Sequence, residues 1–264
     1  MALLKINGVP VQATASEWEP VTLGEMARSL NGAPRSTARV RKANLRYTSG
    51  LLSVPEAQLL RALVDGEGHV LSFEDTASPS AYLYTSRDVG PSDSGGASRS
   101  TSDKKWGTAS LLVPANMTAA WDFGTAYSGQ VTVIGWLHPP GGEWEHYITT
   151  PTNTYLNGEP YGNPESQFWS LYAGTLRLGD LENHDLPFRF DDVVTLPFAV
   201  PDAWVPDLYA FHATQAWPAL PHVLAEDPRL PAGGLLCLGE VGASQALPRR
   251  TSVGERVEFT LYGT

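Results

Sequence analysis

The sequence predicts an all-β fold, mostly strands with two short helices. Its 264 residues include 25 glycines and 21 prolines, together with 8 tryptophans, 10 tyrosines and 8 phenylalanines. Many short strands need this mixture, because the chain must reverse direction often and present flat, half-buried faces. Hydrophobic residues make up 42% and charged residues 17%, which suffices for a packed core, and the length of 264 residues predicts one or two domains.

The charge and the cysteine content exclude several classes of protein. A net charge of −10 gives no overall drive toward nucleic-acid phosphates or anionic lipid. Cys237 is the only cysteine, so the chain forms no intramolecular disulfide and no Cys-rich zinc site. Residues 1–11 lack the apolar run of a signal peptide, and no 18-residue apolar window occurs. We therefore expect a protein made in a cytoplasm, without a membrane span.

The first third of the chain contains turn and helix signals. Asn7-Gly8 between two short apolar runs predicts a β-hairpin, and Pro10 places its second strand at a sheet edge. Asn31-Gly32 repeats the turn signal. Ser53 and Glu56 form a capping box that starts a helix over residues 54–64, and a strand is predicted over residues 68–73.

The rest of the chain predicts a sandwich. Residues 76–105 are rich in Ser, Gly, Asp and Pro and predict a loop or domain junction. A helix is expected from about residue 202 to 216, and a final strand over 256–262. Between the polar segment and this helix lie seven predicted short strands, at residues 110–113, 130–137, 144–149, 154–157, 168–173, 175–178 and 192–196.

Part of the chain resembles laminin-G and concanavalin-A-like domains. The resemblance rests on Gly142-Glu-Trp-Glu-His-Tyr-Ile-Thr-Thr150 with Thr154-Tyr-Leu-Asn-Gly158, and on Phe190-Asp-Asp-Val-Val-Thr-Leu196 with Val200-Pro-Asp-Ala-Trp-Val-Pro-Asp-Leu-Tyr209. It implies a jelly-roll sandwich over about residues 76–212. In that pattern Trp144 is expected to anchor the core.

The flanking segments resemble tail proteins of long-tailed bacteriophages, including distal tail proteins. The resemblance rests on Lys5-Ile-Asn-Gly8, Trp18-Glu-Pro-Val-Thr22, Ala27-Arg-Ser-Leu-Asn-Gly32, Gly68-His-Val-Leu-Ser-Phe73 and the last strand. It implies a small tail-assembly β-barrel over residues 1–75 and 213–264, interrupted by the sandwich. The function so implied is a structural virion protein of a tail or tail tip, assembled in the host cytoplasm.

We expect such a protein to assemble as a ring of identical copies and to contact other tail proteins. A hexamer is favoured by the resemblance, and a trimer is the next choice. The basic stretch from Arg28 to Arg46 has Glu25 as its only nearby acid, and we interpret it as a solvated or subunit-facing strand pair rather than a nucleic-acid site. The candidate interface residues are Arg35, Arg39, Arg41, Lys42 and Arg46.

No pattern indicates an enzyme or a cofactor. Glu143 and Glu145 lack the third acid of the glycosidase strand that concanavalin-A-like enzymes share, and no Gly-x-Ser-x-Gly elbow, P-loop or Gly-x-Gly-x-x-Gly occurs. The six histidines are scattered without a zinc pattern. Asp191-Asp192 could supply oxygens to calcium, although we favour the interpretation that the pair marks the start of a strand. We therefore predict no catalytic residues and no metal.

A carbohydrate-binding adhesion module without a ring-forming role is the alternative function. Aromatic rings with neighbouring amides suit sugars, because the ring stacks and the amide bonds hydroxyls. The candidate glycan-binding residues are Asn153, Tyr155, Tyr161, Asn163 and Trp169. For Trp169 and the adjacent Phe168, packing in the core is the favoured alternative.

Overall fold

The chain divides into two compact units, which are described separately. The computed structural model describes residues 4–23, 26–28, 34–36, 40–65, 69–71, 95–122, 131–162, 168–172, 174–179, 181, 185–218, 222–230, 232–248 and 253–264. Unit 1 comprises Met1–Ile6, Pro10–Gly66 and Pro221–Thr264, and unit 2 comprises Asn7–Val9 and Glu67–Leu220. Asn31-Gly32 and most of the polar segment 76–105 lie outside the described residues.

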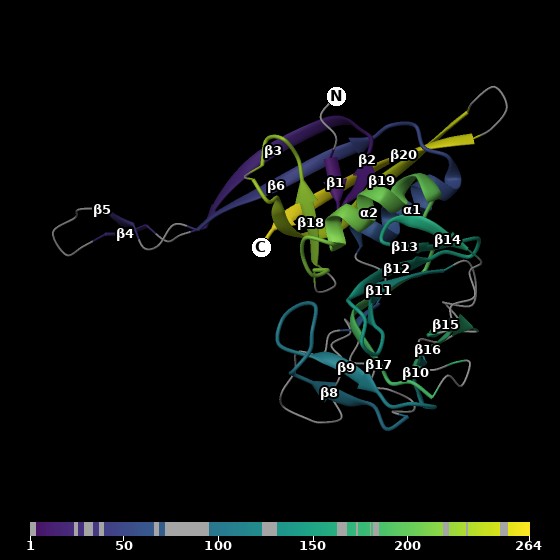
Figure 1. Cartoon of the computed structure of the whole chain (residues 1–264). Coiled ribbons are helices and arrows are strands. Elements are labelled where there is room, and N and C mark those ends of the chain that lie inside the picture. Colours follow the sequence, from purple (N-terminus) through teal and green to yellow (C-terminus); the bar gives the residue numbers. More distant parts are fainter. Residues whose placement is uncertain are drawn as a thin grey trace. The chain divides into compact units, whose positions relative to one another are not determined.

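Unit 1 is built on a seven-stranded sheet in the order β2-β1-β18-β19-β20-β6-β3 (Figure 1). The strands are β1 (Leu4–Ile6), β2 (Val9–Val11), β3 (Ala13–Leu23), β6 (Val40–Ser49), β18 (His222–Glu226), β19 (Leu235–Pro248) and β20 (Val253–Gly263). The predicted hairpin at Asn7-Gly8 is confirmed, with positive φ angles of 48° and 76° at the turn. The predicted edge position of Pro10 is also confirmed, because β2 ends the sheet.

Helix α1 (Val54–Val64) covers the inner face of this sheet and confirms the predicted helix and its capping box. The Ser53 N–H donates to Glu56 Oε2 at 2.7 Å, which satisfies an amide at the helix start. The C-terminal end of α1 lies so close to β19 that a Cβ atom on Gly239 would stand 1.8 Å from the Val64 carbonyl oxygen. Glycine is therefore required at this approach. Arg61 also forms an ion pair with Glu255 on β20.

Strands β3 and β6 continue beyond the rest of the sheet as a two-stranded ribbon (Figure 1). β20 pairs with β6 only from Thr48 to Asn44, whereas β3 pairs with β6 as far as Leu23↔Val40. A small hairpin, β4 (Met26–Arg28) paired with β5 (Pro34–Ser36), follows along the chain. The sheet thus ends in a ribbon that has no third strand among the described residues.

The closed barrel expected for the first and last segments is not seen in the described part of unit 1. The sheet runs from β2 at one edge to β3 at the other, and no described pairing joins these two strands. β3 follows β2 after a single residue, but all its described pairs go to β6, so its other edge is joined to no described strand. The sheet is therefore open.

Unit 2 is a sandwich of two antiparallel sheets, as the sequence predicts. The larger sheet has the order β14-β13-β12-β11-β17-β9-β8, with β7 also paired to β17, and the smaller has the order β10-β16-β15. The strands of the larger sheet are β7 (His69–Leu71), β8 (Ser98–Ser100), β9 (Ser110–Val113), β11 (Thr132–His138), β12 (Glu145–Thr149), β13 (Thr154–Leu156), β14 (Glu159–Gly162) and β17 (Phe188–Leu196). Those of the smaller are β10 (Thr118–Asp122), β15 (Trp169–Tyr172) and β16 (Thr175–Gly179).

The core of unit 2 lies between the two sheets. Trp121 and Trp169 from the smaller sheet pack with Phe190 and Leu137 from the larger one, and all four are almost fully buried. Trp144 does not belong to this core, which corrects the expectation that it anchors the sandwich. It precedes β12 on the opposite face of the larger sheet, where its ring lies 5.2 Å from that of His138. We call that opposite side the outer face of unit 2.

A helical segment lies on the outer face of unit 2. A 3-10 turn, η2 (Asp202–Trp204), leads into helix α2 (Val205–His212), close to the predicted position. The predicted turn at Asn157-Gly158 is confirmed, and a Cβ on Gly158 would stand 2.8 Å from the Tyr209 ring of α2. Unit 2 is larger than the expected 76–212, because β7 pairs with β17 and residues 213–220 also belong to it. No helix among the described residues is long and apolar enough to cross a membrane.

Candidate functional site

A β-bulge in β17 places two consecutive carboxylates on the outer face of unit 2. Ile134 pairs with Val194 and Trp136 pairs with Asp191, so Gly135 alone faces the two residues between them. Asp192 has a φ of 46°, a left-handed conformation that glycine usually takes in such a bulge. Since Phe190 and Val193 point into the core, both aspartates point away from it.

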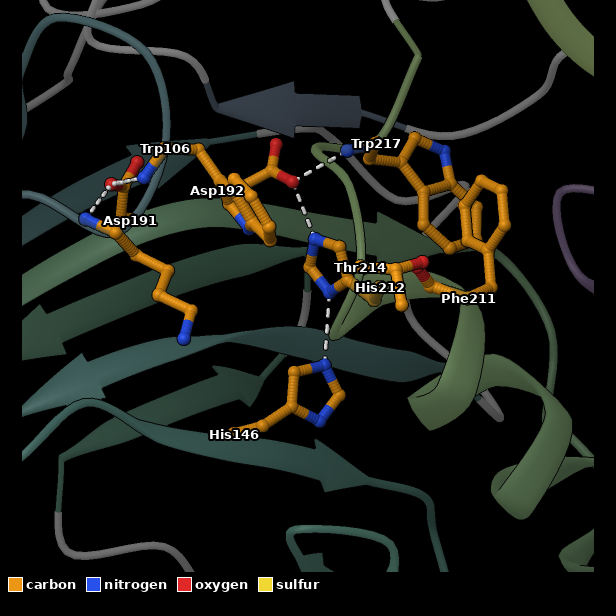
Figure 2. A network of polar contacts seen from close by, with 9 residues as sticks. Trp106, His146, Asp191, Asp192, Phe211, His212, Thr214 and Trp217 are labelled. Carbon is orange, nitrogen blue, oxygen red and sulfur yellow. Dashed lines mark hydrogen bonds and ion pairs between the residues drawn. The ribbon is translucent and has the colours of Figure 1, made fainter. Parts of the chain in front are cut away.

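Asp192 is the first member of a buried polar chain that joins a strand, a helix and a second strand (Figure 2). Its Oδ2 accepts hydrogen bonds from His212 Nε2 on α2 and from the Trp217 N–H at 2.5 Å. His212 Nδ1 lies 2.9 Å from His146 Nε2 on β12. Residues 192, 212 and 146 are far apart in the sequence, and no local pattern links them.

Burial decides what this chain of polar groups can do. His146 and His212 are fully buried, and Asp192 is 6% exposed. Burial, followed by the neighbouring His212 and Lys105, holds the pKa of His146 well below its usual range, so this imidazole is neutral. These groups are closed off from solvent and bond one another. We interpret the Asp192–His212–His146 chain as a latch that fixes α2 to the sheet, and we call it the polar latch.

Asp191 holds a loop against the same face. Its Oδ2 accepts hydrogen bonds from the backbone N–H groups of Lys105 and Trp106, at 2.7 and 2.9 Å (Figure 2). Lys105 Nζ lies 3.8 Å from the centre of the Trp136 ring, a cation–π contact. Burial raises the pKa of Asp191 to about 7. We call residues 101–108, which cross the outer face here, the strap.

The aspartate pair is engaged by protein donors. One oxygen of Asp191 and one of Asp192 each accept two hydrogen bonds from the chain itself. Within the residues that the structure describes, no group of three or more His, Cys, Asp or Glu side chains could hold a metal ion. The two carboxylates thus serve contacts within unit 2.

The predicted glycan-binding residues do not form one surface. Trp169 is 1% exposed and lies in the core, and Tyr155 is 5% exposed. Because Tyr155 pairs with Ile148 on β12 while Trp169 packs between the sheets, the two rings belong to opposite faces. Of the candidates that the structure describes, Tyr161 alone is well exposed, at 61%. Asn153 donates a hydrogen bond to Asp202 at 3.3 Å, and Asn163 lies outside the described residues.

Unit 1 carries an acidic groove of 440 Å³ on the face opposite α1, its outer face. A row of paired residues crosses it, from Glu17 through Arg46 and Thr260 to Glu240. With Glu258, which also lines the groove, three carboxylates surround one guanidinium. The lining residues are Glu17, Arg46, Tyr47, Thr48, Glu240, Gly242, Glu258, Phe259, Thr260 and Tyr262.

An exposed apolar strip adjoins the acidic groove. Leu236, Leu238 and Tyr262 are 41%, 39% and 38% exposed, and Leu238 is the register partner of Tyr262. The Tyr262 hydroxyl donates to Glu240 Oε2 at 2.6 Å and so links the strip to the groove. The strip and the groove therefore form one continuous part of the outer face of unit 1.

Of the predicted interface residues, Arg46 is exposed and lines the acidic groove. Arg35 lies on β5, and Arg41 and Lys42 lie on the part of β6 that pairs with β3 alone. Arg39 lies outside the described residues. The groove itself was not predicted, because its acids come from β3, β19 and β20 and only the strand register brings them together.

The solved structures named below are distant likenesses. No protein-family model and no curated protein matches the chain. The receptor-binding domain of botulinum neurotoxin type G matches with a TM-score of 0.37 at 8% identity, over 55% of this chain and 51% of that one, so the chain spans about half its length. A second structure, the botulinum neurotoxin serotype G binding domain, gives 0.39 at 8% identity over 69% of each chain. The binding domain of botulinum neurotoxin DC gives 0.19 at 7% identity, over 96% and 68%. TM-scores and identities this low support no inference about function.

Proposed function

We propose that the chain is a non-enzymatic structural protein of a bacteriophage tail or tail tip, which assembles with copies of itself and displays unit 2 as a β-sandwich binding module. The tail identity rests on the sequence resemblance of the flanking segments. Its place would be the virion, with other tail proteins as neighbours. The observation that supports self-assembly is the ribbon of β3 and β6.

The ribbon lacks the packing that normally stabilises a pair of strands. A two-stranded hairpin is marginal in water, because it buries little apolar surface and leaves backbone groups unpaired. Val40, Arg41, Lys42 and Ala43 of β6 pair with β3 and with no other described strand. A surface on a second copy would supply the missing contacts.

Charge complementarity indicates which surface of the second copy the ribbon contacts. Between Met26 and Ala43 the sequence has five basic residues and no acid. The acidic groove on the outer face of unit 1 offers Glu17, Glu240 and Glu258. Opposite charges steer two such surfaces into register, with a strength that falls as salt rises. Ribbon and groove are different surfaces, so the contact is heterologous and closes into a ring when the rotation allows.

Sedimentation velocity at micromolar concentration tests this assembly. We expect a discrete oligomer for the wild-type chain, with a hexamer favoured and a trimer next. The pair Arg41→Glu and Lys42→Glu reverses the charge of the ribbon. The pair Glu240→Lys and Glu258→Lys reverses the charge of the groove. Each pair should shift the protein toward monomer, and all four substitutions in one chain should restore the oligomer. Arg177→Glu, an exposed residue on β16 of unit 2, is the matched control.

A wild-type chain that stays monomeric at low and high salt, alone and with tail-tube proteins, would contradict the ring. The second candidate, a carbohydrate-binding adhesion module, would then be favoured. The observation that supports this candidate is a cluster of half-buried Trp144, His138 and Arg189 on the outer face of unit 2.

A further inference from the structure

The outer face of unit 2 carries three donor-bearing side chains near one end of the larger sheet. His138 on β11 is the register partner of Arg189 on β17. Trp144 directly precedes β12, and its ring lies against that of His138 with centroids 5.2 Å apart. A guanidinium, an imidazole and an indole N–H thus meet on a rigid sheet.

The carboxylate of Asp103, which belongs to the strap, lies among these three donors. Its Oδ1 accepts a hydrogen bond from Trp144 Nε1 at 3.2 Å. Its Oδ2 is 3.5 Å from His138 Nε2 and 3.8 Å from Arg189 Nε. The last two distances exceed those of charge-assisted hydrogen bonds, which are about 2.7–2.9 Å. Asp103 therefore occupies the centre of the cluster without bonding it tightly.

Two polar atoms of the cluster have unmet hydrogen-bonding capacity. Arg189 Nε and His138 Nδ1 are buried, and neither has a hydrogen-bond partner among the described residues. Buried donors and acceptors of this kind normally find a partner, because leaving one unpaired costs about 1–3 kcal/mol. Of these two atoms, Arg189 Nε is the one that faces Asp103, so the cluster is suited to an anion that bonds this nitrogen more closely than Asp103 does.

Asp103 can leave this position without unfolding the strap. Its side chain is 32% exposed, whereas its backbone carbonyl accepts a hydrogen bond from Ser110 Oγ at 2.5 Å. The strap is also held at Lys105 and Trp106 by Asp191. A rotation about the Asp103 side-chain bonds is enough to vacate the cluster.

We propose that Arg189, His138 and Trp144 form a carboxylate subsite for an acidic sugar, such as a uronic or sialic acid, and that Asp103 occupies it in the free protein. The ligand carboxylate takes the place of the Asp103 carboxylate and bonds Arg189 and the Trp144 indole N–H. The half-buried rings of Trp144 and His138 provide an apolar edge for the sugar ring. This inference rests on the proposed display role of unit 2, and it does not require a ring of copies.

Calorimetric titration of the full chain with glucuronic acid and N-acetylneuraminic acid tests the subsite. Glucose tests whether the carboxylate is needed for binding, and acetate tests whether the sugar ring is needed. We expect weak binding by the wild type, in the millimolar range, and about tenfold tighter binding by Asp103→Ala. Arg189→Ala should abolish binding. Trp144→Phe, which keeps a ring and removes the N–H, should weaken it. Arg177→Ala on the smaller sheet should bind like the wild type.

Three results would overturn the proposal. One is the absence of acidic-sugar binding by folded Asp103→Ala at about 10 mM ligand. Another is equal binding of glucose, which would show that the carboxylate is not recognised. The third is equal binding of acetate, which would show that the sugar ring is not recognised. Near-ultraviolet circular dichroism checks folding of each variant. Sedimentation of the same samples reports assembly separately, so a failed ring and a failed subsite are distinguishable.

Discussion

The outer faces of the two sheets differ in what they do with polar side chains. In unit 1, Glu258 and Arg46 point away from α1 and remain exposed. In unit 2, Asp192 and His146 also point away from the core, but α2 covers them and they pair with each other through His212. The polar sheet face of unit 1 thus stays exposed to solvent and available to a partner. In unit 2 these polar groups are covered and bond one another. The same residue types are therefore informative about binding only where they stay solvated.

The largest expected effect is on the polar latch. His212→Ala removes the imidazole that bonds the buried Asp192 carboxylate and leaves only the Trp217 N–H as its donor, which should destabilise unit 2 by about 3 kcal/mol. Urea unfolding followed by tryptophan fluorescence measures this, because Trp18 is the one tryptophan of unit 1 and the other seven lie in unit 2. His222→Ala, a half-exposed histidine on β18, is the control. Equal stability of the two variants would contradict the latch.

A smaller effect is expected where helix and sheet meet in unit 1. Gly239→Ala forces α1 and β19 apart, because the added methyl would overlap the Val64 carbonyl. Such overpacking typically costs about 1–3 kcal/mol. Gly242→Ala lies on the exposed part of the same strand and serves as the control. Circular dichroism during thermal unfolding should separate the two variants, and coincident curves would argue against close contact.

The two units should respond to pH with opposite signs. Hydrogen bonds from Arg229 lower the pKa of Asp227 to about 2, so its contribution to unit 1 is complete above about pH 4 and is lost as the pH falls toward 2. Allowing for solvent around the exposed Arg229, the loss is about 1 kcal/mol. Burial raises the pKa of Asp191, so folded unit 2 keeps a proton that the unfolded chain has released. Its stabilising effect is lost as the pH rises from about 4 to 7.

Stability curves of the wild type against Asp227→Asn and against Asp191→Asn isolate these two contributions. The advantage of the wild type over Asp227→Asn should shrink on acidification. Relative to Asp191→Asn, the wild type should instead become less stable as the pH rises. If the stability difference between wild type and variant changed with pH in the same direction for both pairs, the two units would not respond oppositely.

The smallest effect on stability is expected in the exposed apolar strip. Leu238→Ser changes a side chain that is 39% exposed, and should alter the free energy of unfolding by less than about 0.5 kcal/mol. If the outer face of unit 1 is a contact surface, the same substitution should still weaken self-association. Sedimentation and urea unfolding of one preparation test both parts. A large loss of stability would show that Leu238 belongs to the core.

Local chemistry made part of the fold predictable. The helix over 54–64 and the turns at Asn7-Gly8 and Asn157-Gly158 follow from capping and from φ preference, which neighbouring residues decide. The face taken by Trp144 was not predictable in this way. Its strand alternates normally, but the side that becomes the core depends on pairing with distant strands.

The candidate sites were harder to predict from the sequence than the fold, because they depend on which distant residues pair across the sheets. Asp191 and Asp192 share a face only because of the bulge opposite Gly135. His146 and His212 meet only because α2 returns over β12. The glycan-binding prediction failed to find one surface because it assumed that neighbours in sequence share a face, whereas Tyr155 and Trp169 lie on opposite ones.

The unequal edges of the unit 1 sheet limit the symmetry that copies can adopt. β2 is a three-residue edge strand with a central proline that cannot donate a backbone hydrogen bond, whereas β3 offers an edge of 11 residues. Extending the sheet from one copy to the next would join β3 to β3, because the other edge is too short and lacks a donor. That pairing is isologous and stops at a dimer with twofold symmetry. A ring of more than two copies must therefore be built through faces and not through continued strands.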